Sequence, residues 1–98
     1  MEKLNSQESI FEIVRQLCAS HISGLTNKDL AIAMKTSEAN ICRDMALFEK
    51  NEWVTRGNGS RWRLSPTFGA FAGLIIRSYQ EAKLRLTEEE AKFASAMQ

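Results

Sequence analysis

The sequence predicts a mainly helical fold that contains one small β-hairpin. Two observations predict it. Apolar residues recur at helical spacing over most of the chain, and one segment turns β-rich on both sides of Asn58-Gly59. The chain has 98 residues, which fits one domain with a helical extension. We expect the domain over residues 1–66 and the extension over residues 67–98.

The composition is that of an ordinary globular protein. Hydrophobic residues make up 44% and charged residues 26%, which argues against disorder. The formal net charge is only +1, so a nucleic-acid-binding function must rest on where the charges lie. The longest apolar run, near residues 71–76, is too short to span a bilayer, and the N-terminus is too polar for a signal peptide. We therefore expect a cytoplasmic protein that does not enter a membrane.

The first predicted helix covers residues 7–21. Ser6 or Ser9 is its expected N-cap, and Gly24 follows its end. We expect Leu25 in a short strand before the next helix. The apolar face of this helix consists of Ile10, Ile13, Val14 and Leu17.

Two further helices follow with a tight turn between them. Thr26-Asn27-Lys28-Asp29 has the form of a capping box and predicts a short helix over 27–34. Lys35-Thr36-Ser37 is the predicted turn, and Ser37 is a favourable N-cap for a helix over 38–51. The expected core residues of the two helices are Leu30, Ala31, Met34, Ile41, Met45 and Phe48.

The β-rich segment predicts a two-stranded ribbon. Its arms are Trp53-Val54-Thr55-Arg56 and Arg61-Trp62-Arg63-Leu64, joined by Gly57-Asn58-Gly59-Ser60. Arg61 and Arg63 are two residues apart and share one face, so Trp62 takes the other face. Residues 53–65 contain three arginines and no acid.

The C-terminal segment predicts one or two further helices. Ser65 caps a helix that begins at Pro66, and its apolar residues occupy more than one stripe, which predicts cover from two sides. Leu86-Thr87-Glu88-Glu89-Glu90 resembles a second capping box and predicts a new helix at Thr87; the alternative is one continuous helix. We expect this segment to form a homodimer interface through Phe71, Leu74, Ile75 and Tyr79.

This order of elements is that of a winged helix-turn-helix. In such a fold the third helix enters the major groove of DNA, and the ribbon carries arginines toward the backbone or the minor groove. Asn40 suits adenine, Arg43 suits guanine or phosphate, and Glu38 suits cytosine, whereas Glu38 and Asp44 both oppose general attraction to DNA. The predicted DNA-binding residues are Lys28, Ser37, Glu38, Ala39, Asn40, Arg43, Arg56, Asn58, Arg61 and Arg63.

Several short motifs together resemble the N-terminal DNA-binding domain of IclR-type transcriptional regulators. They are Gly24-Leu25-Thr26, Asp29-Leu30-Ala31, Ile41-Cys42-Arg43, Trp53-Val54 and Arg61-Trp62-Arg63-Leu64-Ser65-Pro66. The resemblance covers residues 8–75 and implies a transcriptional regulator that reads double-stranded DNA with its third helix. Asn51-Glu52 departs from the family pattern, which has a small residue followed by glycine. The chain has no room for the family's effector-binding domain, so no small-molecule effector is expected.

Other functions have weaker support. A winged-helix module that binds protein and not DNA is the alternative, and the low net charge favours it. His21 has no partners with the spacing of a metal site or catalytic triad, and no glycine-rich phosphate loop is present, so we expect no enzyme activity, metal or cofactor. Cys18 and Cys42 are expected to be buried thiols without a disulfide.

Overall fold

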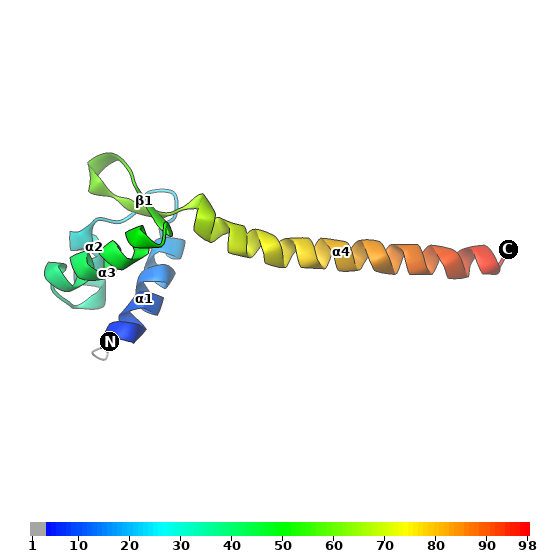
Figure 1. The fold of residues 1–98 in the computed structure, drawn as a ribbon, viewed down its shortest axis with the longest axis horizontal. Coiled ribbons are helices and arrows are strands. Elements are labelled where there is room, and N and C mark those ends of the chain that lie inside the picture. The colour runs from blue at the N-terminus through cyan, green and yellow to red at the C-terminus, as the bar shows by residue number, and fades with distance from the viewer. Residues whose placement is uncertain (1–3) are drawn as a thin grey trace. The chain divides into compact units, whose positions relative to one another are not determined.

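The structure, a computed structural model, describes residues 4–98 and is mainly helical with one antiparallel hairpin (Figure 1). This confirms the predicted class. The chain divides into two compact units, one ending at Phe68 and one running from Gly69 to Gln98. The elements in chain order are α1 (Ser6–Ala19), α2 (Asn27–Met34), α3 (Glu38–Lys50), β1 (Val54–Arg56), a 3₁₀ turn (Asn58–Ser60), β2 (Trp62–Leu64) and α4 (Pro66–Ala96).

Side-chain caps fix where the helices begin. Thr26 and Asp29 exchange both bonds of a capping box at α2, and Ser37 Oγ accepts from the Asn40 N–H at α3, as predicted. Ser65 Oγ accepts from the Phe68 N–H at the start of α4, which confirms Ser65 as a cap.

The prediction for the cap of α1 was wrong. Asn5 is the cap, because its Oδ1 accepts from the N–H groups of Gln7 and Glu8 at 3.0 and 2.8 Å. Ser6 is the first residue inside the helix. Ser9 lies one turn further on, and its hydroxyl donates to Asp44 of α3 at 2.9 Å. Ser9 therefore joins two helices and caps neither.

Both α2 and α3 end in a left-handed residue that is not glycine. Lys35 has φ 53° and Glu52 has φ 60°. In each case the next residue donates its N–H back five positions, from Thr36 to the Ala31 carbonyl and from Trp53 to the Phe48 carbonyl, both at 3.0 Å. This is the Schellman pattern, in which glycine is the usual left-handed residue.

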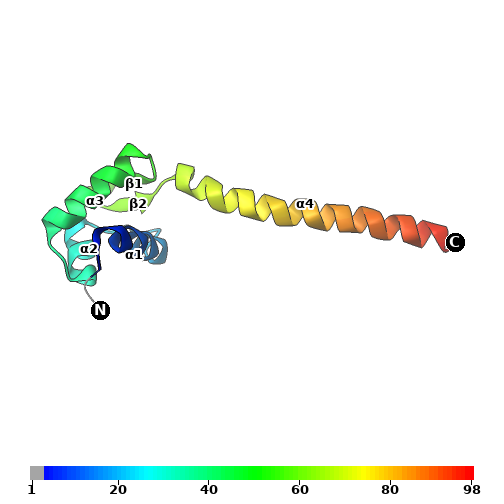
Figure 2. The ribbon, with the colours of Figure 1, turned by 60° about the horizontal axis from the view of Figure 1, so that its bottom comes forward.

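The core of the first unit lies between α1, α2, α3 and the hairpin. Figures 1 and 2 show the three helices packed together with the hairpin on one side of them. All six core residues predicted on α2 and α3 are buried, together with Ile13 and Leu17 of α1; Ile10 and Val14 are only partly buried. The hairpin adds Val54, Trp62 and Leu64.

The hairpin pairs with a third segment along its outer edge. Val54 pairs with Leu64 and Arg56 with Trp62 between the two strands. Leu25 pairs with Trp62 from the other side through two backbone bonds of 3.0 and 2.7 Å, which confirms an extended Leu25. Gly24, just before it, has φ 75° and lies so close to β2 that a Cβ there would meet the Trp62 carbonyl oxygen at 2.8 Å.

The C-terminal segment is one continuous helix, so the predicted second start at Thr87 is wrong. Thr87 does not act as a cap, since its Oγ1 donates to the Lys83 carbonyl within the helix at 2.9 Å. Glu, Ala, Lys and Leu dominate this stretch and favour uninterrupted helix. No residue from 69 to 98 is buried, so the expected cover on two sides is absent in the single chain.

Gly24→Ala is expected to destabilise the first unit by about 2–3 kcal/mol, because alanine must adopt a left-handed backbone and displace the β2 carbonyl. Urea unfolding followed by tryptophan fluorescence measures this, since Trp53 and Trp62 both belong to the first unit. Gly57→Ala is the control, because the nearest atom to its Cβ is 3.9 Å away. Equal effects of the two substitutions would contradict the close approach at Gly24.

Glu52→Gly is expected to stabilise the first unit by about 1 kcal/mol, because glycine removes the cost of a left-handed backbone at the end of α3. Asn51→Gly, at the neighbouring position with φ −92°, is expected to destabilise it. The same urea unfolding experiment compares the two variants. A loss of stability in Glu52→Gly would show that the glutamate side chain stabilises the fold by more than its left-handed backbone conformation destabilises it.

Candidate nucleic-acid interface

The start of α3 presents a polar face to solvent. Ser37, Glu38, Ala39, Asn40 and Arg43 are all exposed. The opposite face is buried in the core, which fixes the direction in which these five side chains point. The predicted set on this helix is therefore brought together on one accessible surface.

Two residues that the prediction missed share this face. Cys42 and Ala46 are exposed and follow Ala39 by three and seven positions. The same periodicity that identified the core face would have found them. With Ala39 they form a strip of short side chains beside Arg43, so an approaching molecule can come close to the helix backbone.

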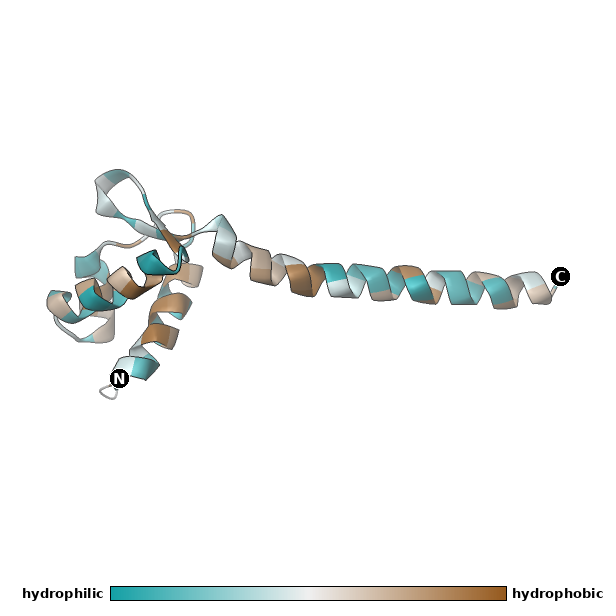
Figure 3. Cartoon of the chain, viewed as in Figure 1, coloured by the Kyte–Doolittle hydropathy of each residue, from teal (hydrophilic) through white to brown (hydrophobic). Residues whose placement is uncertain are grey.

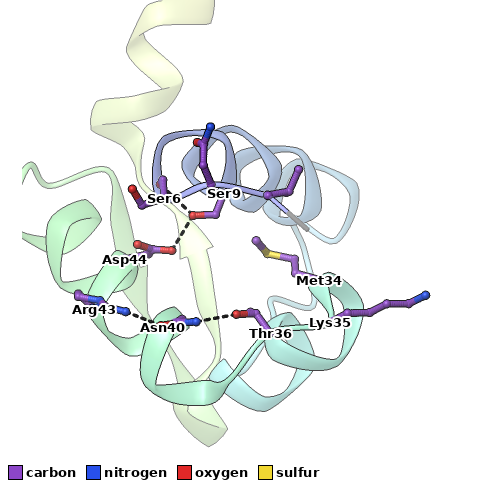
Figure 4. Close-up of a pocket in the computed structure, with 10 residues that line it drawn as sticks. Ser6, Ser9, Met34, Lys35, Thr36, Asn40, Arg43 and Asp44 are labelled. Carbon is purple, nitrogen blue, oxygen red and sulfur yellow. Dashed lines mark hydrogen bonds between the residues drawn. The ribbon is translucent and has the colours of Figure 1, made fainter. Parts of the chain in front are cut away.

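A chain of hydrogen bonds runs along the surface from Arg43 to the turn before α3 (Figure 4). Arg43 donates Nη2 to Asn40 Oδ1, and Asn40 donates Nδ2 to Thr36 Oγ1 at 2.9 Å. Asn40 is thus held by both ends of its amide. These bonds orient the guanidinium and the amide before any ligand arrives.

An open groove of about 750 Å³ lies next to this chain. The first turns of α1, the turn after α2 and one side of α3 form its walls (Figure 4). Asp44 faces this groove and accepts from the Ser9 hydroxyl, so its charge lies on the α1 side of α3. Asp44 lines this groove together with Asn40 and Arg43, so both acids expected to oppose DNA lie near the predicted recognition residues.

The hairpin arginines have partners inside the protein. Arg61 Nη1 donates to the Gly24 carbonyl at 3.1 Å and lies 3.7 Å from the Asp29 carboxylate. Arg63 Nε donates to the His21 carbonyl at 2.8 Å. Both arginines therefore fasten the segment after α1 to β2, a role that the sequence did not reveal. Arg63 and Arg61 flank Trp62 on the opposite face, as predicted.

Arg56 and Asn58 complete the hairpin candidates. The Arg56 guanidinium lies 4.4 Å from the centre of the buried Trp62 ring, a cation–π arrangement that covers the indole. Asn58 is exposed in the 3₁₀ turn at the tip. Trp62 itself is only 4% exposed and donates Nε1 to Asn27 Oδ1 at 2.8 Å, so it anchors the hairpin.

The remaining predicted residues are also on the surface. Lys28, in the first turn of α2, is exposed, and so is Lys35 at the other end of this helix. The four predicted dimer residues of α4, Phe71, Leu74, Ile75 and Tyr79, are 47–66% exposed in the single chain.

The structure corrects the prediction for the cysteines. Cys18 and Cys42 are not in a disulfide, but both are exposed, whereas buried thiols were expected. They lie on outward positions of their helices, between the core residues. Within residues 4–98, no three metal-ligating side chains gather, and no helix has the length and apolar character to cross a bilayer.

Two carboxylates of the first unit have lowered pKa values. The backbone N–H of Thr26, followed by its side chain, holds the pKa of Asp29 below the ordinary value of 3.8, and Arg61 and Lys28 lower it further. The Gln16 amide, followed by Arg15, lowers the pKa of Glu12. The capping box at α2 is therefore strongest when Asp29 is ionised.

Neither family models, nor curated proteins, nor solved structures give a significant match to this chain. The resemblance to IclR-type regulators, which rests on short motifs, therefore stays a prediction.

The lowered pKa of Asp29 predicts a loss of stability in acid. A carboxylate with a lower pKa in the folded chain stabilises the fold above its unfolded-state pKa, and this contribution disappears as the pH falls through the folded-state value. Unfolding free energies measured below pH 3.8 should therefore fall less steeply in Asp29→Asn than in the wild type. Glu12→Gln should also flatten the slope, because the pKa of Glu12 is lowered as well, and the two effects should add in the double substitution. An unchanged slope in Asp29→Asn would contradict this role.

Proposed function

We propose that residues 6–66 form a winged helix-turn-helix that binds double-stranded DNA in a sequence-specific manner and regulates transcription. In this proposal α2 and α3 are the helix-turn-helix, α3 enters the major groove, and the β1–β2 hairpin is the wing. The observation that carries it is the hydrogen-bonded pair of Arg43 and Asn40 on the exposed face of α3, where the neighbouring side chains of Ala39, Cys42 and Ala46 are short.

The chemistry of this face suits base edges. A guanidinium donates two bonds to guanine, and an amide offers a donor and an acceptor to adenine. The short side chains of Ala39, Cys42 and Ala46 would let the helix backbone approach the floor of the groove. Ser9 donates to the Asp44 carboxylate without neutralising it, so Glu38 and Asp44 both still oppose general attraction of DNA to this surface.

The hairpin would contribute charge beside the groove. Each guanidinium carries five N–H donors, so the bonds of Arg61 and Arg63 to backbone carbonyls leave further donors for phosphate. Arg56, Asn58, Lys28 and Lys35 supply additional exposed donors. In this proposal such contacts position the protein, while α3 reads the sequence.

A second function is favoured by the hairpin contacts. Arg61 and Arg63 both bind backbone carbonyls of the same unit, and the net charge is only +1. A winged-helix module that binds another protein has no need of a positive field. DNA titration separates the two functions directly.

Fluorescence anisotropy with a random-sequence duplex at several salt concentrations tests the proposal. The wild type should bind at low salt and weaken as salt rises. A site selected from a random library should then lose about 1–3 kcal/mol of binding free energy in Arg43→Ala. Arg15→Ala is the matched control, because it removes one charge from α1, where Arg15 forms an ion pair with Glu12.

Two outcomes would contradict the proposal. Absence of binding even at low salt would favour the protein-interaction module. Equal losses in Arg43→Ala and Arg15→Ala would mean that the affinity reflects net charge and that α3 does not read bases. Unfolding curves of both variants should match the wild type, since both arginines are exposed.

A further inference from the structure

The second unit is a long amphipathic helix with no cover in its own chain. Its large apolar residues are exposed, among them Ile75 at 60%, Tyr79 at 66%, Leu86 at 63% and Phe93 at 76%. Figure 3 shows apolar residues along the whole of α4, concentrated in its first turns. Helices in proteins derive most of their stability from packing of an apolar face, so this face requires a partner.

One stripe of α4 follows a heptad repeat. Starting at Ala72, steps of three and four alternate to Ala96, and the stripe is apolar at every step except Glu89; Leu74 and Leu84 lie outside it. The a positions are Ala72, Tyr79, Leu86 and Phe93. The d positions are Ile75, Ala82, Glu89 and Ala96. A seam with this 3.5-residue period is the pattern of a left-handed coiled coil, and it is sustained here for more than three heptads.

We propose that α4 pairs with α4 of a second copy of this chain as a parallel, two-stranded coiled coil. The inference rests on α4 alone and not on the proposed DNA binding. A parallel pair would nevertheless bring the N-terminal ends of both α4 helices together, and two copies of α3 suit a DNA site with two-fold symmetry.

Charges beside the seam select a second copy in parallel orientation. In a parallel pair, position g faces position e of the next heptad in the partner. Arg85 at g then faces the partner's Glu90 at e, and symmetry repeats this contact. Further up, Phe71 at g faces the partner's Ile76 at e, which widens the apolar contact.

Glu90 has no opposite charge three or four positions away in its own helix, where its neighbours are Leu86, Thr87, Phe93 and Ala94. A parallel copy would place Arg85 opposite Glu90, in addition to the acids Glu81, Glu88 and Glu89 that flank Arg85 in its own helix. An antiparallel pair that aligns the same seam sets Arg85 against the partner's Arg85 and Lys83 against the partner's Lys83, two like-charge contacts.

Glu89 is the single charged residue in the seam. A parallel pair places it in one layer with the partner's Glu89, which weakens association but disfavours other registers. The seam therefore predicts a dimer of moderate affinity that a single substitution can tighten. Recovery by charge exchange between Arg85 and Glu90, and not this tightening alone, distinguishes a specific parallel pair from non-specific association of apolar surface.

Sedimentation equilibrium of the full chain, without DNA, tests the pairing. Cysteines are kept reduced because Cys18 and Cys42 are exposed. The wild type should show a monomer–dimer equilibrium. Arg85→Glu and Glu90→Arg should each raise the dissociation constant by about tenfold, since two attractive contacts become repulsive. The double exchange, Arg85→Glu with Glu90→Arg, should restore most of the loss.

Two further variants complete the design. Glu89→Leu should lower the dissociation constant by about tenfold or more, because it removes the like-charge layer and adds apolar surface. Arg77→Glu, on the side of α4 opposite the seam, is the control and should change little. Recovery in the double exchange, with tighter association of Glu89→Leu, supports the parallel pair. A monomeric Glu89→Leu, a trimer or tetramer, or no recovery in the double exchange overturns it.

Discussion

The position of Trp62 is the constraint on which the rest of the first unit depends. Its backbone pairs with Arg56 on one side and with Leu25 on the other, so one residue holds three segments together. Its ring is buried, its indole N–H donates to Asn27 at the start of α2, and the Arg56 guanidinium lies over the face of the ring. Loss of this residue would release the hairpin, the segment after α1 and the first turn of α2 at once.

The parts of the fold that depend on local chemistry were predictable from the sequence. The caps at Thr26 and Ser37 set the starts of α2 and α3, because a hydroxyl just before a helix accepts a hydrogen bond from a free backbone N–H of the first turn. The buried stripes of α2 and α3 were predicted residue by residue, since a spacing of three and four admits one buried face. The exposed Arg43 and Asn40 followed from the same geometry.

Features that depend on distant partners were not predictable. Arg61 and Arg63 were predicted as DNA-contacting wing residues, but carbonyl groups about 40 positions earlier accept hydrogen bonds from them. The predicted bounds of α2 match and those of α3 differ by one residue, but the left-handed backbone of Lys35 and Glu52 could not be predicted, because glycine is the usual residue there. Thr87 resembled an N-cap, but the preceding turn of α4 is helical, and the Thr87 hydroxyl donates to the Lys83 carbonyl of that turn. For the two arginines tertiary contacts decided the outcome, whereas for Thr87 the helix propensity of its own segment did.

For the DNA binding proposed above, the bonds of the hairpin arginines to carbonyl oxygens bear on the rate of association. A carbonyl group accepts a hydrogen bond without neutralising the guanidinium, so Arg63 keeps its full charge while its position is fixed. Asp29 offsets part of the charge of Arg61, whereas Arg56 lies over an uncharged ring. The rigid hairpin thus projects a positive field whose influence on a polyanion extends about one Debye length, roughly 8 Å at physiological ionic strength. Such a field accelerates diffusional capture even when no arginine touches the captured molecule.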